Sequence, residues 1–315
     1  MTPGADRLSD PSLTPKQQEI LSHLLLFGQP RPSFDAGMAL RFRSALESVL
    51  RPVAEQLPPG QRLGVRKHDL SNVLQCEGLY RARRDQPFSW SLETARGHLV
   101  HAAIQRHVTS SRVRPPLDLA EAAMANAAAD DGSGPGPFLR SLSGDERDDL
   151  LTQVADILTK FVLDWPPIPR SWVPRVESSQ SVSVHGESIQ LRAKVDLALG
   201  RPTGREARVF IVDFKTGSAS PHYMDDLRLY ALVELIARGS PPFRVASYYL
   251  DSGTYQAEDV TEDTLESAVT RVAAGVQRMW AVRPGGRQPQ LSPNPLCPYC
   301  PALAGCEPGQ EATAS

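Results

Sequence analysis

The sequence predicts an α/β fold in which a central mixed sheet is flanked by helices. Helical periodicity dominates the first half of the 315-residue chain, and strand-like segments appear only after about residue 172. The later segments follow in the order of three strands, a helix, a strand and a helix, which fits a mixed sheet covered by helices. Because 41 % of the residues are apolar, a chain of this length can bury a full core.

The predicted helices carry apolar residues at helical spacing, and the predicted strands are short apolar segments. The breaker-rich connection 130–137 and the proline cluster Pro166, Pro167 and Pro169 separate elements in the first half. A plausible hairpin turn, His185-Gly186-Glu187, joins the first two strands. We expect helices at 14–27, 36–56, 70–84, 91–110, 117–129, about 143–163, about 221–238 and about 262–282, and strands at 172–184, 189–199, 208–214 and 244–250.

Charge and composition limit the function classes. The formal net charge is only −2, so any binding to nucleic acid must come from local basic clusters such as Arg81, Arg83 and Arg84, or Arg41 and Arg43. Segment 1–11 lacks the apolar core of a signal peptide, and the longest apolar run, 20–27, is too short to span a bilayer. We therefore expect a cytoplasmic protein without a membrane partner. In that compartment the four cysteines are better explained as metal ligands or inert core residues than as disulfides.

Two aspartates lie in neighbouring predicted strands. Asp213 closes the apolar segment 208–212, and Asp196 ends a similar segment seventeen positions earlier. Carboxylates at such positions can converge on a hard divalent cation, and Lys215 lies on the same strand face as Asp213. A metal, a water and a cation at one point supply what phosphodiester hydrolysis needs, because the metal activates water and the charges stabilise the transition state. The pattern predicts a metal-dependent phosphodiesterase.

These motifs resemble the RecB-like branch of the PD-(D/E)XK nucleases. The matching stretches are Gly97-His98-Leu99-Val100-His101, then Asp196, then Ile211-Val212-Asp213-Phe214-Lys215-Thr216-Gly217. The branch usually carries a Q-x-x-x-Y helix downstream, where this chain has Asp226-Leu227-Arg228-Leu229-Tyr230. The tyrosine is kept but the glutamine is not, and a carboxylate in its place should repel phosphate. The resemblance implies a restriction-endonuclease-like core with an N-terminal helical region and a C-terminal cysteine-ligated segment.

The cysteines extend the resemblance. Cys297-Pro298-Tyr299-Cys300 followed by Cys306, with Cys76 far upstream, is similar to the arrangement in iron–sulfur nucleases of the AddB type and in the CRISPR-adaptation exonucleases. Four thiolates suit a 4Fe-4S cluster, and tetrahedral zinc would accept the same set. The domains implied are an N-terminal helical region at 1–69, a nuclease domain at 70–306 closed by the cysteines, and a flexible tail at 307–315.

The resemblance also implies roles for single residues. His101, Asp196 and Asp213, joined by the backbone carbonyl of Phe214, would hold Mg²⁺ or Mn²⁺. Lys215 would orient the attacking water and stabilise developing negative charge, and Tyr230 would help to position the scissile phosphate. Glu177, on the first predicted strand, is better explained as an ordinary strand-face charge.

The function expected is that of a metal-dependent DNA nuclease, an exonuclease by resemblance, in DNA repair, recombination or phage defence. The chain has no G-x-x-x-x-G-K-[ST] phosphate loop, so any ATP-driven unwinding must come from a helicase or another complex partner. One alternative is an inactive nuclease-fold subunit that binds DNA as a scaffold, supported by Asp226. Another is an ordinary endonuclease with a structural zinc site.

Overall fold

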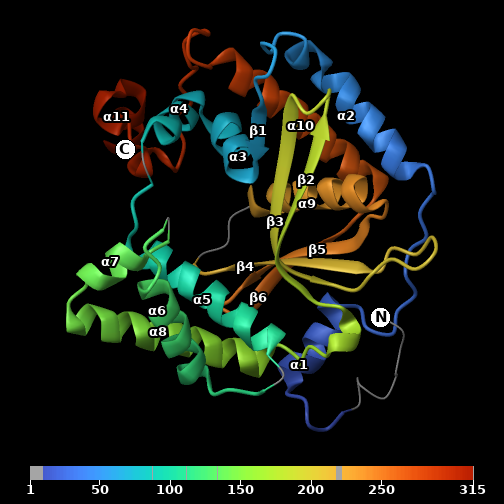
Figure 1. The fold of residues 1–315 in the computed structure, drawn as a ribbon, viewed down its shortest axis with the longest axis vertical. Coiled ribbons are helices and arrows are strands. Elements are labelled where there is room, and N and C mark those ends of the chain that lie inside the picture. The colour runs from blue at the N-terminus through green and yellow to red at the C-terminus, as the bar shows by residue number, and fades with distance from the viewer. Residues whose placement is uncertain (1–9, 87, 111, 133, 218–221, 315) are drawn as a thin grey trace.

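The structure, a computed structural model, describes residues 10–86, 88–110, 112–132, 134–217 and 222–314. Within these ranges one mixed sheet carries helices on both faces, which confirms the predicted α/β class (Figure 1). Helices α5, α6, α7 and α8 group at the lower left of the view, and α3, α4 and α11 at the upper left. Pro221, with which we expected a helix to begin, and the chain ends 1–9 and 315 lie outside the described residues.

The sheet has the order β1-β3-β4-β5-β6, and β2 pairs with β3 as well. Neighbours β1 and β3 run parallel, as do β4 and β5, whereas the other pairs are antiparallel. The strands are β1 (Leu63–Arg66), β2 (Arg175–Val184), β3 (Ile189–Leu199), β4 (Val209–Lys215), β5 (Pro242–Tyr249) and β6 (Thr254–Asp259).

Strand β3 changes partners in its middle. It pairs with β1 through Ile189–Arg192 and with β4 through Leu197–Leu199. It also changes cores there, because Val195 packs in one hydrophobic core and Leu197 in the other. Asp196 therefore lies where β1 and β4 diverge, a position at which a polar side chain from the middle of a strand can reach an open site.

Each face of the sheet has its own core. On one face the helices are α2 (Met38–Ala54), α3 (Lys67–Gln75), α9 (His222–Arg238) and α10 (Glu262–Ala281). On the other face they are α1 (Pro15–Glu19) with the π-helical turn Ile20–Leu24, α5 (Leu92–Thr109), α6 (Pro116–Ala128) and α8 (Gly144–Asp164). The shorter helices are α4 (Glu77–Asp85), α7 (Gly136–Ser141) and α11 (Glu307–Ala314), with 3-10 turns at Arg170–Trp172, Cys297–Tyr299 and Leu303–Gly305.

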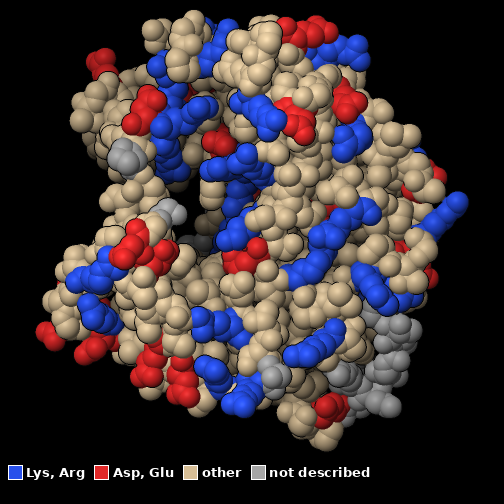
Figure 2. Space-filling view, in the orientation of Figure 1, with Lys and Arg blue, Asp and Glu red and all other residues tan. Residues whose placement is uncertain are grey.

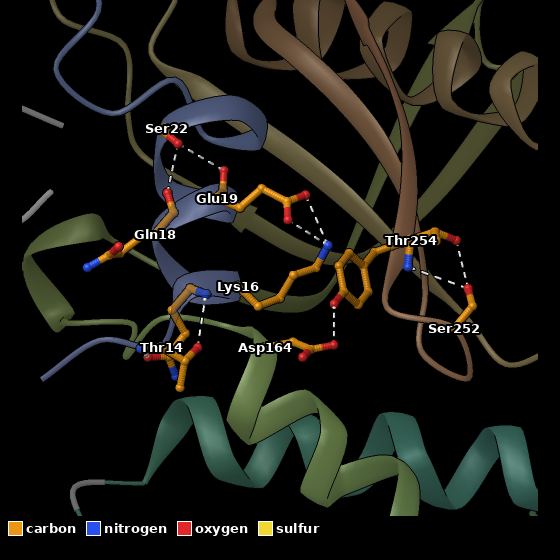
Figure 3. Close-up of polar contacts among 10 residues, drawn as sticks. Thr14, Lys16, Gln18, Glu19, Ser22, Asp164, Ser252 and Thr254 are labelled. Carbon is orange, nitrogen blue, oxygen red and sulfur yellow. Dashed lines mark hydrogen bonds and ion pairs between the residues drawn. The ribbon is translucent and has the colours of Figure 1, made fainter.

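The N-terminal segment is part of the core. Thr14 caps α1 and donates a hydrogen bond from Oγ1 to the carbonyl of Leu163 at 2.8 Å. Figure 3 shows α1 beside Asp164, at the end of α8, and beside Ser252, in the turn between β5 and β6, and Thr254, the first residue of β6. The apolar residues of the following turn are almost completely buried. This segment therefore closes one end of the second core.

The structure departs from the predicted elements where the apolar pattern is weak. Strand β1 buries only Val65, and β6 has no buried residue, so neither gives the alternation that predicts a strand. Because β1 belongs to the sheet, the predicted N-terminal region 1–69 is not purely helical. Helix α7 begins inside the breaker-rich connection, and the segment predicted as a flexible tail contains α11.

The helix predicted at 70–84 is two helices. Cys76 has extended backbone angles, with φ −159° and ψ 122°, and separates α3 from α4. Periodicity alone could not locate this break because apolar spacing continues across it. The interruption places the Cys76 side chain at the N-terminus of α4, facing the C-terminal segment of the chain.

Candidate active site

His101 is positioned by α5. The helix begins at a capping box formed by Ser91 and Thr94. A Cβ atom at Gly97 would lie 3.2 Å from Oγ1 of Thr216, so glycine allows α5 to approach the end of β4 closely. His101, four residues later, lies on the same helix face and reaches the sheet. The Gly-x-x-x-His spacing thus has a packing explanation.

Asp196 joins the two strands and the helix. Its Oδ2 accepts a hydrogen bond from the backbone N–H of Phe214 at 2.7 Å, and its Oδ1 lies 3.3 Å from Nδ1 of His101. Glu177 Oε1 lies 3.5 Å from the same imidazole nitrogen, and its Oε2 lies 2.5 Å from Nζ of Lys194. Ligand atoms of His101, Glu177 and Asp196 all lie within 4.8 Å of one another, an arrangement that could hold a metal ion.

We had expected Glu177 to be an ordinary strand-face charge. The structure instead places its carboxylate with His101 and Asp196. Glu177 has φ 50°, a left-handed conformation that is rare for a residue with a side chain. A signal for it existed in the sequence. Val184 pairs with Ile189 across the turn, and the register continued from that pair sets Glu177 opposite Asp196. Residues opposite each other in antiparallel strands share a face, so the hairpin brings the two carboxylates together.

Two carboxylates control the protonation of His101. Burial lowers the pKa of His101, but Asp196 and Glu177 outweigh it and raise the pKa to about 10. Burial and the nearby charge of Asp213 raise the pKa of Asp196. Two carboxylates thus hold a proton on the imidazole, and a divalent cation would have to displace that proton in order to bind.

Asp213 lies beside this group and is paired with lysines. It is 3 % exposed, Nζ of Lys67 lies 3.2 Å from its Oδ1, and Lys215 forms an ion pair with its Oδ2. Burial raises the pKa of Asp213, but the two lysines outweigh it and hold the pKa well below its usual range. Asp213 precedes Phe214, whose N–H binds Asp196, so the two aspartates occupy adjoining positions of β4 and β3.

Tyr230 and Asp226 lie one turn apart on α9. Tyr230 is 2 % exposed, and Nζ of Lys67 lies 5.3 Å from the centre of its ring. Asp226, which stands where the family usually has glutamine, accepts a hydrogen bond from Oγ of Ser71 at 2.9 Å. The carboxylate is thus engaged with α3, and burial raises the pKa of Asp226.

The four cysteines come together from distant parts of the chain. Cys76, Cys297, Cys300 and Cys306 are free and line one cavity, which has a volume of about 130 Å³. Backbone N–H groups point at two of the sulfur atoms, from Ser292 to Cys76 at 3.5 Å and from Asn294 to Cys297 at 3.3 Å. Arg287 also ties the C-terminal segment to α4 through two hydrogen bonds, of 2.6 and 2.7 Å, to the buried carboxylate of Glu77.

A basic groove continues from the site. A first hollow is bordered by Asp196, Lys194 and Tyr230, and a second hollow by six arginines. Arg66 and Arg192 line both hollows, so the two adjoin. Figure 2 shows this face hollowed, with Lys and Arg atoms along the wall. The sequence suggested two basic clusters. Arg83 and Arg84 of one cluster border the second hollow, whereas Arg41 and Arg43 of the other pair with acidic side chains and border neither hollow. The arginines of the second hollow are Arg62, Arg66, Arg83, Arg84, Arg192 and Arg283.

Comparison with known families agrees with this geometry. The model of the PD-(D/E)XK nuclease superfamily matches residues 68–307. The chain belongs to the PD-(D/E)XK nuclease superfamily. Membership and the His101, Glu177 and Asp196 group support a metal-dependent nuclease that hydrolyses phosphodiester bonds. No described helix has both the length and the apolarity needed to cross a membrane.

Curated protein sequences gave no match, and similar solved structures are distant. A candidate exonuclease from Eubacterium rectale has 13 % identity and a TM-score of 0.45, covering 76 % of this chain and 86 % of its own. The protein SSO0001 has 12 % identity and a TM-score of 0.34, covering 86 % of this chain and 97 % of its own.

Proposed function

We propose that this PD-(D/E)XK protein is a Mg²⁺- or Mn²⁺-dependent deoxyribonuclease, and that it acts as an exonuclease in DNA repair, recombination or phage defence. One observation carries the proposal: His101, Glu177 and Asp196 form a compact donor group next to the Asp213 and Lys215 pair. Carboxylate oxygens with a single imidazole are ligands that suit Mg²⁺ and Mn²⁺.

His101, Asp196, Asp213 and the carbonyl of Phe214 would hold the divalent cation, and Glu177 would join them. When bound, the cation supplies a Lewis acid that activates water and neutralises charge on the phosphate. His101 lies on α5, Asp196 on β3 and Asp213 on β4, and the buried core fixes these three elements in place. A site carried on packed elements stays pre-organised, so the ligands need little rearrangement to bind the ion.

Two further side chains would act on the substrate. Lys215, at the end of β4, keeps a compact ammonium beside Asp213, where it can orient the attacking water and stabilise negative charge on the phosphate. Burial and the charge of Asp213 raise the pKa of Tyr230 well above its usual range, so the hydroxyl remains a hydrogen-bond donor at neutral pH. That donor would help to position the scissile phosphate.

The basic groove supports DNA as the substrate. The net charge of −2 provides no general attraction, but the arginines from Arg62 to Arg283 concentrate positive charge in one groove that adjoins Asp196. Local clusters of this kind bind phosphates through release of counterions, which makes binding weaken as salt rises. We propose that the DNA backbone follows this groove to the site.

We further propose that the four cysteines hold a 4Fe-4S cluster. The thiols line one cavity, and N–H groups point at two sulfur atoms, as in sites that stabilise iron–sulfur clusters. Tetrahedral zinc would accept the same four thiolates, so iron content and visible absorption separate the two metals. A reducing compartment such as the cytoplasm would keep the thiols available.

In this proposal, residues 70–306 form the nuclease domain and the cluster ties its C-terminal segment to the start of α4. A helicase or another subunit of a repair or defence complex would supply unwinding. The alternative of an inactive DNA-binding scaffold was based on Asp226, which replaces the usual glutamine. Because the Asp226 carboxylate accepts a hydrogen bond from Ser71, its presence does not favour that alternative.

The decisive experiment is a nuclease assay of the purified protein with Mn²⁺ or Mg²⁺. We expect degradation of linear DNA, and we expect Asp213→Asn to reduce the rate by about a hundredfold or more. Asp225→Asn, on α9 and paired with Arg228 and Arg271, serves as a matched control. DNA binding without cleavage by the wild-type protein would refute the enzyme and favour the scaffold.

A further inference from the structure

Lys67 is a second lysine at the candidate active site, and neither the D-x-K motif nor the matched family range contains it. It is the first residue of α3, and the family match begins one residue later, at residue 68. Its Nζ lies 3.2 Å from Oδ1 of Asp213, and its side chain is 18 % exposed. Of the five lysines in the chain, three surround this site: Lys67, Lys194 and Lys215.

The position of Lys67 is electrostatically costly. A cation in the first turn of a helix faces the positive end of the helix dipole, and burial adds to the cost. The ion pair with Asp213 and the position of the ammonium group over the ring of Tyr230, 5.3 Å from its centre, offset this cost.

A metal ion held by Asp213 would compete with its two lysines. Lys67 lies at one carboxylate oxygen and Lys215 at the other, so a cation approaching Asp213 competes with each ammonium group.

Lys67 borders the groove that leads to the site. Lys67 lines the same hollow as Asp196 and Tyr230, and that hollow continues into the arginine groove. A phosphate that reaches Tyr230 therefore comes within reach of Lys67. We propose that Lys67 is a second catalytic lysine, which binds a phosphate oxygen of the substrate beside the scissile bond. This role rests on the nuclease function proposed above.

The test combines a substitution in the protein with one in the substrate. Lys67→Met should lower the cleavage rate of single-stranded DNA by about a hundredfold, and Lys67→Arg should recover part of it because a cation remains. Lys160→Met is the matched control. Lys160 is exposed on α8, donates a hydrogen bond to the carbonyl of Asp251, and lines neither hollow of the groove. Circular dichroism and the melting temperature establish that each variant is folded.

A series of oligonucleotides then replaces one phosphate at a time by a neutral methylphosphonate. At the phosphate that Lys67 contacts, this change should slow the wild-type protein strongly and Lys67→Met far less, because the contact is already lost. A purely structural Lys67 would give the same relative loss in both proteins at every position.

The outcomes separate the two proposals. If the wild type cleaves and Asp213→Asn does not, the nuclease proposal stands, and near-normal cleavage by Lys67→Met or equal losses at every phosphate overturn the role of Lys67 alone. If Lys67→Met does not fold, Lys67→Gln and Lys67→Arg carry the same substrate series. If the wild type cleaves no DNA, both proposals fall.

Discussion

Replacing His101 by asparagine should change how stability depends on pH in protein freed of divalent cations. The folded-state pKa of His101 is raised to about 10 from an ordinary value of 6.5. A folded state that binds the proton more tightly than the unfolded state gains stability, which is complete below pH 6.5 and is lost as pH rises through about 10. The free energy of unfolding should therefore fall over this window.

The size of the effect follows from the two pKa values. Linkage gives a loss of about 2.5 kcal/mol between about pH 7 and about pH 9, and a ceiling near 5 kcal/mol over the whole window. Guanidinium unfolding followed by tryptophan fluorescence, with EDTA present, measures this quantity. The wild type should lose its advantage over His101→Asn as pH rises.

Two histidines on the same helix provide controls of opposite sign. Burial lowers the pKa of His107, and burial with the charge of Lys194 lowers the pKa of His98. The contribution of these two histidines to the free energy of unfolding is therefore lost as pH falls, not as it rises. A parallel pH dependence of the wild type and His101→Asn would refute the reasoning, because it would mean that Asp196 and Glu177 do not hold the proton. Added Mg²⁺ should flatten the dependence, since it binds only the unprotonated imidazole.

Three further predictions concern the metal, the substrate and the cysteines. Glu177→Gln should weaken Mn²⁺ binding by about 10- to 100-fold in calorimetric titration, whereas Glu187→Gln, on the exposed hairpin turn, should leave it unchanged. Tyr230→Phe should lower kcat more than it raises KM; an unchanged kcat would assign the ring to packing alone. Cys300→Ser should remove the brown colour and iron and lower the melting temperature, and a colourless, zinc-containing wild type would exclude the iron–sulfur cluster.

The sequence by itself determined the fold class and most of the elements. Strand β3 alternates apolar and polar residues along most of its length, and β4 is an almost continuous buried run, so their bounds were predicted within a residue or two. The candidate site residues Asp196, Asp213 and Lys215 came from their positions in two predicted strands, and His101 and Tyr230 came from the resemblance to the RecB-like branch. Local periodicity carries this information because each pattern lies within one element.

Only the tertiary structure decided what depends on contacts between elements. The hairpin register sets Glu177 opposite Asp196, but the left-handed backbone conformation of Glu177 follows from no pattern in the sequence. Lys67 reaches Asp213 over 146 positions in the chain, and its segment carries no motif. Asp226 meets Ser71 in the same way, which turns an expected repulsion of phosphate into a bond between helices. Which charges neighbour one another is set by how the helices pack on the sheet, and local sequence patterns do not encode those distances.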